Sequence, residues 1–193
     1  LRCRWPRSCL SERPWTHGQR ALAARRSDPE TAAYQGWTVP FSLEDARVLI
    51  AAVEDLGGPT PGAWFQAAIV VTSSGDVVGD LAVHLTEDGQ TARLGYTLDP
   101  GERGHGYATE AAALMIDYLV NVVRVHRIEA DTDPRNGPSG RVLSRLGFTL
   151  EGVMRESFWL DGEVSDSAFW GLLARDWRGV VQHPRRASRR RRP

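Results

Sequence analysis

The sequence predicts an α+β fold built around one mixed, mostly antiparallel sheet. Three apolar, β-branched segments separated by tight turns lie between residues 64 and 98, which is typical of an antiparallel meander. A helical segment at 106–122 then precedes a further strand, and a strand–helix–strand order within antiparallel material indicates a mixed sheet. The Asp161-Gly162 dipeptide, favoured in tight turns, predicts a closing hairpin.

The part of the chain before the sheet is expected to be helical. Residues 21–26 favour a helix, and Ser27-Asp28-Pro29-Glu30 then supplies a capping residue, a proline for the first turn and an acid. Ser42 can cap a second helix that runs to residue 56, where Gly57-Gly58-Pro59 ends it. The apolar stripe of this helix is Ala46, Leu49, Ile50 and Val53.

The strands and the later helices follow in order. Strands are expected at 64–72, 77–85, 92–98, 127–132, 148–160 and 164–173. A short helix is expected at 138–145, ended by Gly147. The helix at 106–122 carries one apolar face, formed by Ala111, Leu114, Met115, Tyr118, Leu119 and Val122.

The formal net charge of zero is the sum of three unlike segments. Residues 1–26 hold seven Arg and one acid, residues 185–193 hold six Arg and no acid, and the span between them holds eleven Arg against twenty-three acids. We expect an irregular basic segment at 1–20, where no clean periodicity occurs, and an Arg-rich tail at 179–193, with a domain at 21–178 between them. The tail is either disordered and solvated or a weak tether to RNA or the ribosome.

The composition also indicates the cellular location and whether a metal site is expected. No segment reaches the ~18–20 apolar residues that a membrane-spanning helix needs, and no apolar stretch of a secretory signal follows the basic start. The only cysteines, Cys3 and Cys9, are too few for a four-ligand zinc site. A cytoplasmic protein without a metal, either monomer or homodimer, is therefore expected.

A glycine-rich loop joins a strand to a helix within the segment 94–110, LGYTLDPGERGHGYATE. Small residues let a ligand approach the backbone, and the unpaired amides at the start of a helix favour a phosphate. Arg103 adds a positive charge, and Thr109 adds a hydroxyl. The glycines alone are equally consistent with a simple connecting turn, and their spacing excludes a P-loop and the Rossmann fingerprint.

Three ordered motifs carry a resemblance to a known family. Residues 103–108 read RGHGYA and lead into Thr109-Glu110-Ala111, residues 136–139 read NGPS and lead to Leu146-Gly147-Phe148, and DGE at 161–163 leads to RDW at 175–177. The first resembles the Arg/Gln-x-x-Gly-x-Gly/Ala motif of the GNAT N-acetyltransferases, and the second is similar to that of their RimJ/RimL-like branch. The resemblance covers residues 21–178.

This resemblance implies an acetyl-CoA-dependent N-acetyltransferase, in which a primary amine attacks the thioester directly in a ternary complex. It implies a sheet whose middle strands splay apart, flanked by helices, with the pantetheine arm beside Thr97–Asp99 like an added strand. The pyrophosphate would lie on the amides of residues 104–108. The implied CoA-binding residues are Leu98, Asp99, Arg103, Gly104, His105, Gly106, Tyr107, Ala108, Thr109, Asn136, Ser139 and Arg141.

Two residues before the short helix have both a structural and a functional interpretation. Asn136 and Ser139 are favoured in turns and helix caps. By resemblance, Asn136 contacts the pantetheine, and Ser139 either protonates the leaving thiolate or holds a water that does. Arg141 either meets a CoA phosphate or is a solvated helix residue.

The proton acceptor departs from the family pattern. RimJ/RimL-like proteins often carry Glu two residues before the Gly-Tyr of the third strand, where this chain has Arg93. A charged amine must lose a proton before it attacks, so a base or a water chain is needed. The candidates are Glu129, which we favour acting through water, Asp131 on the same strand face, and Asp80; each is equally a plain surface acid.

Aromatic residues are expected to shape the acceptor site or to belong to the core: Tyr34, Trp37, Phe158 and Trp159. The acidic middle of the chain favours a cationic acceptor, such as a peptide or protein N-terminus or a small cationic amine. Arg93 leaves open a second hypothesis, a catalytically degenerate CoA-binding module with a regulatory or docking role.

Overall fold

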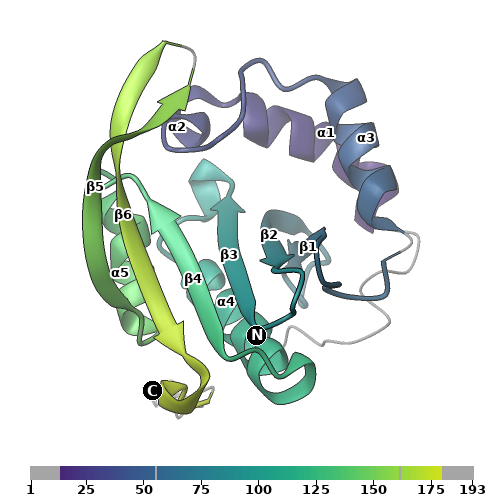
Figure 1. The fold of residues 1–193 in the computed structure, drawn as a ribbon. Helices are drawn as coiled ribbons and strands as arrows, with labels where there is room; N and C mark the ends of the chain where they lie inside the picture. Colours follow the sequence, from purple (N-terminus) through teal and green to yellow (C-terminus); the bar gives the residue numbers. More distant parts are fainter. Residues whose placement is uncertain (1–13, 55, 161, 180–193) are drawn as a thin grey trace, which may run out of the picture.

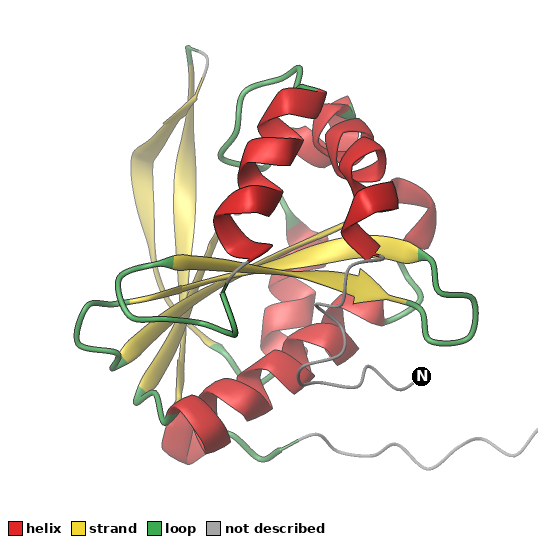
Figure 2. Ribbon diagram, turned by 90° about the vertical axis from the view of Figure 1, so that its right-hand side faces the viewer, coloured by secondary structure: helices red, strands yellow, loops and turns green. Residues whose placement is uncertain are grey.

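The computed structural model describes residues 14–54, 56–160 and 162–179. They form a six-stranded sheet in the order β1-β2-β3-β4-β6-β5, with helices on both faces (Figures 1 and 2). β3 and β4 are parallel neighbours, and every other neighbouring pair is antiparallel. The predicted α+β class with a mixed, mostly antiparallel sheet is confirmed.

The strands begin and end within two residues of their predicted limits. The first three form the predicted meander, and the last two form the predicted hairpin, whose turn contains Gly162 at a φ of 83°. The strands are β1 (Trp64–Val70), β2 (Val77–Leu85), β3 (Thr91–Leu98), β4 (Arg127–Thr132), β5 (Thr149–Leu160) and β6 (Glu163–Leu173).

Three helices at the start of the described chain cover one face of the sheet: α1 (Pro14–Ser27), α2 (Pro29–Ala32) and α3 (Leu43–Glu54) (Figure 1). The start of α1 at Pro14 corrects the expectation of an irregular segment as far as residue 20. Asp28 caps α2 by accepting from the Thr31 amide at 2.7 Å. Ser42 and Asp45 cap α3 reciprocally, as a capping box does.

The opposite face is covered by α4 (Tyr107–Tyr118) and α5 (Gly137–Arg145), which lie behind the sheet in Figure 1. A π turn (η2, Leu119–Val123) extends α4. Because a π turn advances less per residue than an α-helix, Val122 leaves the predicted apolar stripe and is 63% exposed. Its expected place on the buried face is therefore wrong.

The main core fills the space between the sheet and α4, and a small second core lies between α1 and α3. Phe65, Ile116 and Ile128 are fully buried in the first. Leu22, Ala46 and Ile50 form the second, which confirms the apolar stripe predicted for α3. The first core holds α4 against the strands that carry the site, and the second holds α1 and α3 together.

β3 and β4 pair over only three residues and then separate. Their register joins Thr91 to Arg127, Ala92 to Ile128 and Arg93 to Glu129. Beyond these pairs β3 continues to Leu98 alongside β2, and β4 continues alongside β6. The two central strands therefore splay apart, as expected, and leave a wedge between them.

Some sequence expectations lie outside the described residues. These are the two cysteines, the start of the basic N-terminal segment and the Arg run at 185–193. Within the described residues, no helix combines the length and apolarity that crossing a membrane requires. That same part of the chain contains no cluster of His, Cys, Asp or Glu suited to a metal ion.

Candidate active site

The glycine-rich loop lies at the wide end of the wedge. After β3, a short 3-10 turn (η1, Pro100–Glu102) leads to Gly104 and Gly106, which adopt φ values of 83° and 88°. Gly106 is the N-cap of α4 and offers no side chain to the amides of the first helical turn. A Cβ built on either glycine meets nothing within 4 Å, so the left-handed backbone, rather than crowding, requires glycine here.

Replacing Gly106 with Ala should lower the free energy of unfolding by about 1–2 kcal/mol, because alanine is strained at this φ. Gly101→Ala is the matched control in the same loop, since Gly101 is also uncrowded but has no positive φ. Chemical denaturation of both variants checks the prediction. Equal stability of the two would contradict it.

The backbone of β3 presents unpaired groups to the wedge. Thr91 accepts from the Thr86 amide, and the Asp99 amide donates to Val78. Along an antiparallel strand, the backbone groups of successive residues point alternately to the partner strand and away from it. The odd-numbered residues of β3 therefore bond to β2. The N–H and C=O groups of Tyr96 and Leu98 therefore point toward the wedge, where an extended ligand can pair with them as a strand does.

Helix α5 contributes polar groups to the far side of the wedge. Asn136 caps α5 by accepting from the Ser139 amide at 3.3 Å, which is the structural role expected for this residue type. The Ser139 hydroxyl lies 2.9 Å from the Tyr96 hydroxyl, which also donates to the Ser139 carbonyl oxygen at 3.1 Å. This bridge from β3 to α5 was missed in the sequence, where Tyr96 is an ordinary strand residue. Arg141 is exposed on the same helix.

Burial raises the pKa of Tyr96 to about 12, the largest effect on this phenol. The folded protein thus keeps the proton between pH 10 and 12, where the unfolded chain loses it, so folding stability falls as pH rises through that window. We expect a loss of roughly 2–3 kcal/mol from this group. Urea denaturation across that range should show the loss in the wild type, and Tyr96→Phe should lack it; parallel curves would contradict the assignment.

On the other face of the wedge, beneath α1–α3, lies a cleft of about 450 Å³. Its walls include Tyr34, Trp37 and Phe158, three of the four aromatic residues predicted for the acceptor site. Trp159 does not line the cleft: it is 71% exposed, and its indole N–H donates to the Glu156 carbonyl oxygen. The structure therefore brings three of the four predicted aromatic residues together in the cleft and leaves the fourth outside it.

The floor of the cleft is low because small residues meet on two adjacent strands. Gln66, Ala82 and Gly95 lie in one row across β1, β2 and β3. Ala82 and Gly95 leave a low floor, while the next row carries the large side chains of Trp64 and Arg93. The floor therefore lies beside the point where β3 and β4 separate.

The acidic residues considered as acceptors of the amine's proton lie in different parts of the structure. Asp131 lines the cleft, whereas Glu129 accepts from Arg127 Nε at 2.7 Å and is not among the lining residues. Asp133 also lines the cleft, but it pairs with Arg135, whose hydrogen bonds lower the pKa of Asp133. Asp80 is 1% exposed, lies in an ion cluster and is not among the lining residues.

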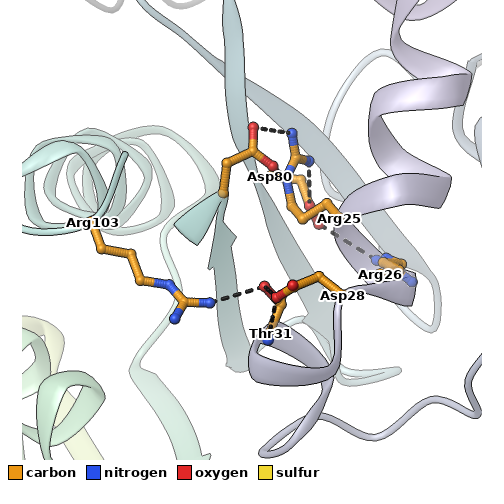
Figure 3. Close-up of polar contacts among 7 residues, drawn as sticks. Arg25, Arg26, Asp28, Thr31, Asp80 and Arg103 are labelled. Carbon is orange, nitrogen blue, oxygen red and sulfur yellow. Dashed lines mark hydrogen bonds and ion pairs between the residues drawn. The ribbon is translucent and has the colours of Figure 1, made fainter. Parts of the chain in front are cut away.

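That buried cluster ties the acceptor side of the molecule to the glycine loop. Arg25 Nη1 pairs with Asp80 at 3.1 Å, and Arg25 Nε pairs with Asp99, the residue after β3, at 2.6 Å. At the other end of the loop, Arg103 donates to Thr31 Oγ1 at 2.9 Å (Figure 3). Arg103 also pairs with Glu30. Both ends of the loop are thus held by the helices above the cleft. His105 is exposed between them.

Comparison with known proteins agrees with this geometry. Residues 10–149 match the model of the acetyltransferase (GNAT) domain. An uncharacterised N-acetyltransferase, p20, of Bacillus licheniformis is 31% identical over 154 residues, which are 79% of this chain and 85% of that protein. The ribosomal protein uS5-alanine N-acetyltransferase of Escherichia coli is 36% identical over 84 residues, 44% of this chain and 43% of the relative.

Solved structures show the same fold. A putative acetyltransferase from T. thermophilus superposes with a TM-score of 0.68 at 27% identity, covering 83% of each chain. The spermidine N-acetyltransferase of Vibrio cholerae, in complex with CoA and spermine, superposes with a TM-score of 0.71 at 17% identity, covering 86% of this chain and 93% of that one.

The proteins that this chain resembles in sequence and in fold are acetyltransferases. The chain belongs to the GNAT acetyltransferase family, and its similarity to proteins named as N-acetyltransferases includes the RimJ-like ribosomal protein enzymes.

Proposed function

We propose that the protein transfers the acetyl group of acetyl-CoA to a primary amine, at a peptide or protein N-terminus or on a small molecule, by direct attack in a ternary complex. One observation carries the proposal: the wedge between β3 and β4 joins the glycine loop on one side to the acceptor cleft on the other. A thioester arm lying in the wedge would meet an amine in the cleft without leaving the protein.

The residues around the wedge suit CoA. Its pantetheine arm would pair with the free backbone groups of β3, and its pyrophosphate would lie on the first amides of α4, where the helix dipole favours negative charge. CoA in the Vibrio cholerae neighbour supports this use of the fold. The proposed binding residues are Leu98, Asp99, Arg103, Gly104, His105, Gly106, Tyr107, Ala108, Thr109, Asn136, Ser139 and Arg141.

Acetyl-CoA supplies an activated acetyl thioester, and the chain supplies the proton transfers around it. The amine nitrogen forms a bond to the acetyl carbon as the carbon–sulfur bond breaks, so a proton must leave the nitrogen and one must reach the sulfur. We assign the sulfur's proton to the Ser139 hydroxyl, directly or through water. The Tyr96 phenol, which is protonated near pH 7, is hydrogen-bonded behind it.

The acceptor of the amine's proton is proposed to be Asp131, directly or through water. Asp131 lines the cleft. Glu129 does not line it, and its carboxylate accepts a hydrogen bond from Arg127. Glu129 remains the alternative, on the same face of β4. Asp131→Asn should then lower kcat more than Glu129→Gln does, and the reverse order would assign the role to Glu129.

The test of the proposed function is acceptor-dependent release of free CoA thiol from acetyl-CoA, measured over a panel of amines and peptides. We expect thiol release together with an acetylated amine found by mass spectrometry. Binding of acetyl-CoA without turnover of any acceptor would instead support a docking module, the interpretation that Arg93 left open.

A further inference from the structure

Two arginines line the acceptor cleft, although the acidic middle of the chain suggests a cationic acceptor. Arg93 stands on β3, and its side chain is 53% exposed. Its pairing with Asp131 is loose, with Arg93 Nε and Asp131 Oδ1 3.8 Å apart. Arg93 is therefore available to a bound molecule.

Arg26 is the second arginine, and it is held rigidly. Only 7% of Arg26 is exposed, and its guanidinium carbon lies 4.4 Å from the ring centre of Trp37 and 5.0 Å from that of Phe41. Its Nη2 donates to Gln66 at 3.3 Å and to Asp80 at 3.4 Å. Stacking and bonding on these sides fix the plane of the group before any ligand arrives.

The guanidinium of Arg26 is nevertheless under-bonded. Its Nε is buried without a hydrogen-bond partner among the described residues. Among the described residues, Nε is the buried side-chain nitrogen that lacks a partner, and Nη1 does not belong to that class. Since Arg26 lines the cleft, its guanidinium is within reach of a molecule that binds there. A buried cation with unused donors is a strong site for an oxygen acceptor.

Arg26 lies at one end of the cleft, whereas Arg93 lies nearer the carboxylates and pairs loosely with Asp131. The Arg26 head lies with Gln66 on β1 and Asp80 on β2, and the low floor of Ala82 and Gly95 separates it from Arg93. The carboxylates of the lining are those of Asp131 on β4, Asp133 just after β4 and Asp166 on β6. In the strand order, two to three spacings separate the Arg26 head from β4, roughly 10–14 Å at the usual strand separation.

We propose that the acceptor carries an oxygen-bearing group, a carboxylate or a carbonyl, that lies on this floor between Arg26 and Arg93 while its amine faces the wedge. The proposal rests on the proposed function and names its substrate class: amines with such an oxygen, in contrast to polyamines. A second ammonium at this position would face two guanidinium groups and would be repelled.

Four five-carbon amines that differ only at the far end test the proposal: 5-aminopentanoate, 5-aminopentanamide, pentylamine and 1,5-diaminopentane. Their binding to the enzyme saturated with CoA is measured by calorimetry, so the result does not depend on turnover. We expect the carboxylate to bind most tightly, then the amide, and the carboxylate to bind at least about tenfold more tightly than the diamine. A diamine that binds equally or better, or no detectable binding of the carboxylate at millimolar concentrations, overturns the proposal.

Arg93→Gln and Arg26→Gln should each reduce this preference several-fold, while Arg47→Gln, the same change on the exposed face of α3, should leave it unaltered. Because Arg26 also belongs to the buried ion cluster, Arg93→Gln and the wild-type panel decide the question if Arg26→Gln does not fold. An unchanged ratio of the carboxylate and diamine affinities in Arg93→Gln overturns the proposal. The proposed function fails separately, if the preferred compound binds but is never acetylated.

Discussion

Replacing Asp80 with Asn is expected to lower the free energy of unfolding by about 3–5 kcal/mol, the largest effect on stability that the structure predicts. The Asp80 carboxylate is 1% exposed and pairs with both Arg25 and Arg26. Asn has nearly the same volume but no charge, so two buried guanidinium groups lose a shared counterion. Chemical denaturation followed by circular dichroism measures the change.

Glu44→Gln is the matched control, because it also removes one carboxylate from an Arg pair. The pair between Glu44 and Arg47 lies on the surface, with side chains 74% and 55% exposed. Such a pair contributes at most about 0.5 kcal/mol. Similar losses in the two variants would show that the cluster beneath α1 does not stabilise the fold as described.

Ser139→Ala is expected to lower kcat about a hundredfold, with a much smaller effect on the KM for acetyl-CoA. The substitution removes the hydroxyl that lies 2.9 Å from the Tyr96 hydroxyl. It keeps the backbone amide that donates to Asn136, so the start of α5 is retained. Steady-state kinetics of thiol release measure the two constants separately.

Ser144→Ala controls for the loss of a hydroxyl from the same helix. Ser144 is exposed, and its Oγ donates to the Gly140 carbonyl oxygen within α5. Its replacement should leave both constants unchanged. If Ser139→Ala also retained the wild-type kcat, the proton on the sulfur would come from another group, and Tyr96→Phe would be the next variant to measure.

Local patterns in the sequence predicted the elements of this fold well. The alternation of apolar residues and the turn residues located all six strands, and the Ser42 cap located α3, because both signals depend on residues close together in the chain. Val122 was wrongly predicted to lie on the buried face because the local sequence pattern does not indicate a π turn. The glycine loop was recognisable because helix starts and positive φ angles constrain the local sequence.

Local sequence patterns could not predict which residues form the site, because these residues meet through contacts between distant parts of the chain. Arg25 and Arg26 belong in sequence to a basic N-terminal segment, yet their partner Asp80 lies more than fifty residues away. Glu129 and Asp131 share one face of a strand, so periodicity cannot separate them. Only the point where β3 and β4 diverge, together with the pairing of Arg127, distinguishes their surroundings.

Hydrogen exchange with and without acetyl-CoA tests the central claim, that the wedge and the glycine loop bind this molecule. We predict that acetyl-CoA slows exchange at the amides of Tyr96 and Leu98, which face the wedge, and at those of residues 107–109 in the first turn of α4. The amides of Thr97 and Asp99 should change little, because they already bond to β2. Protection confined to other parts of the chain, or none at saturating acetyl-CoA, would contradict the account.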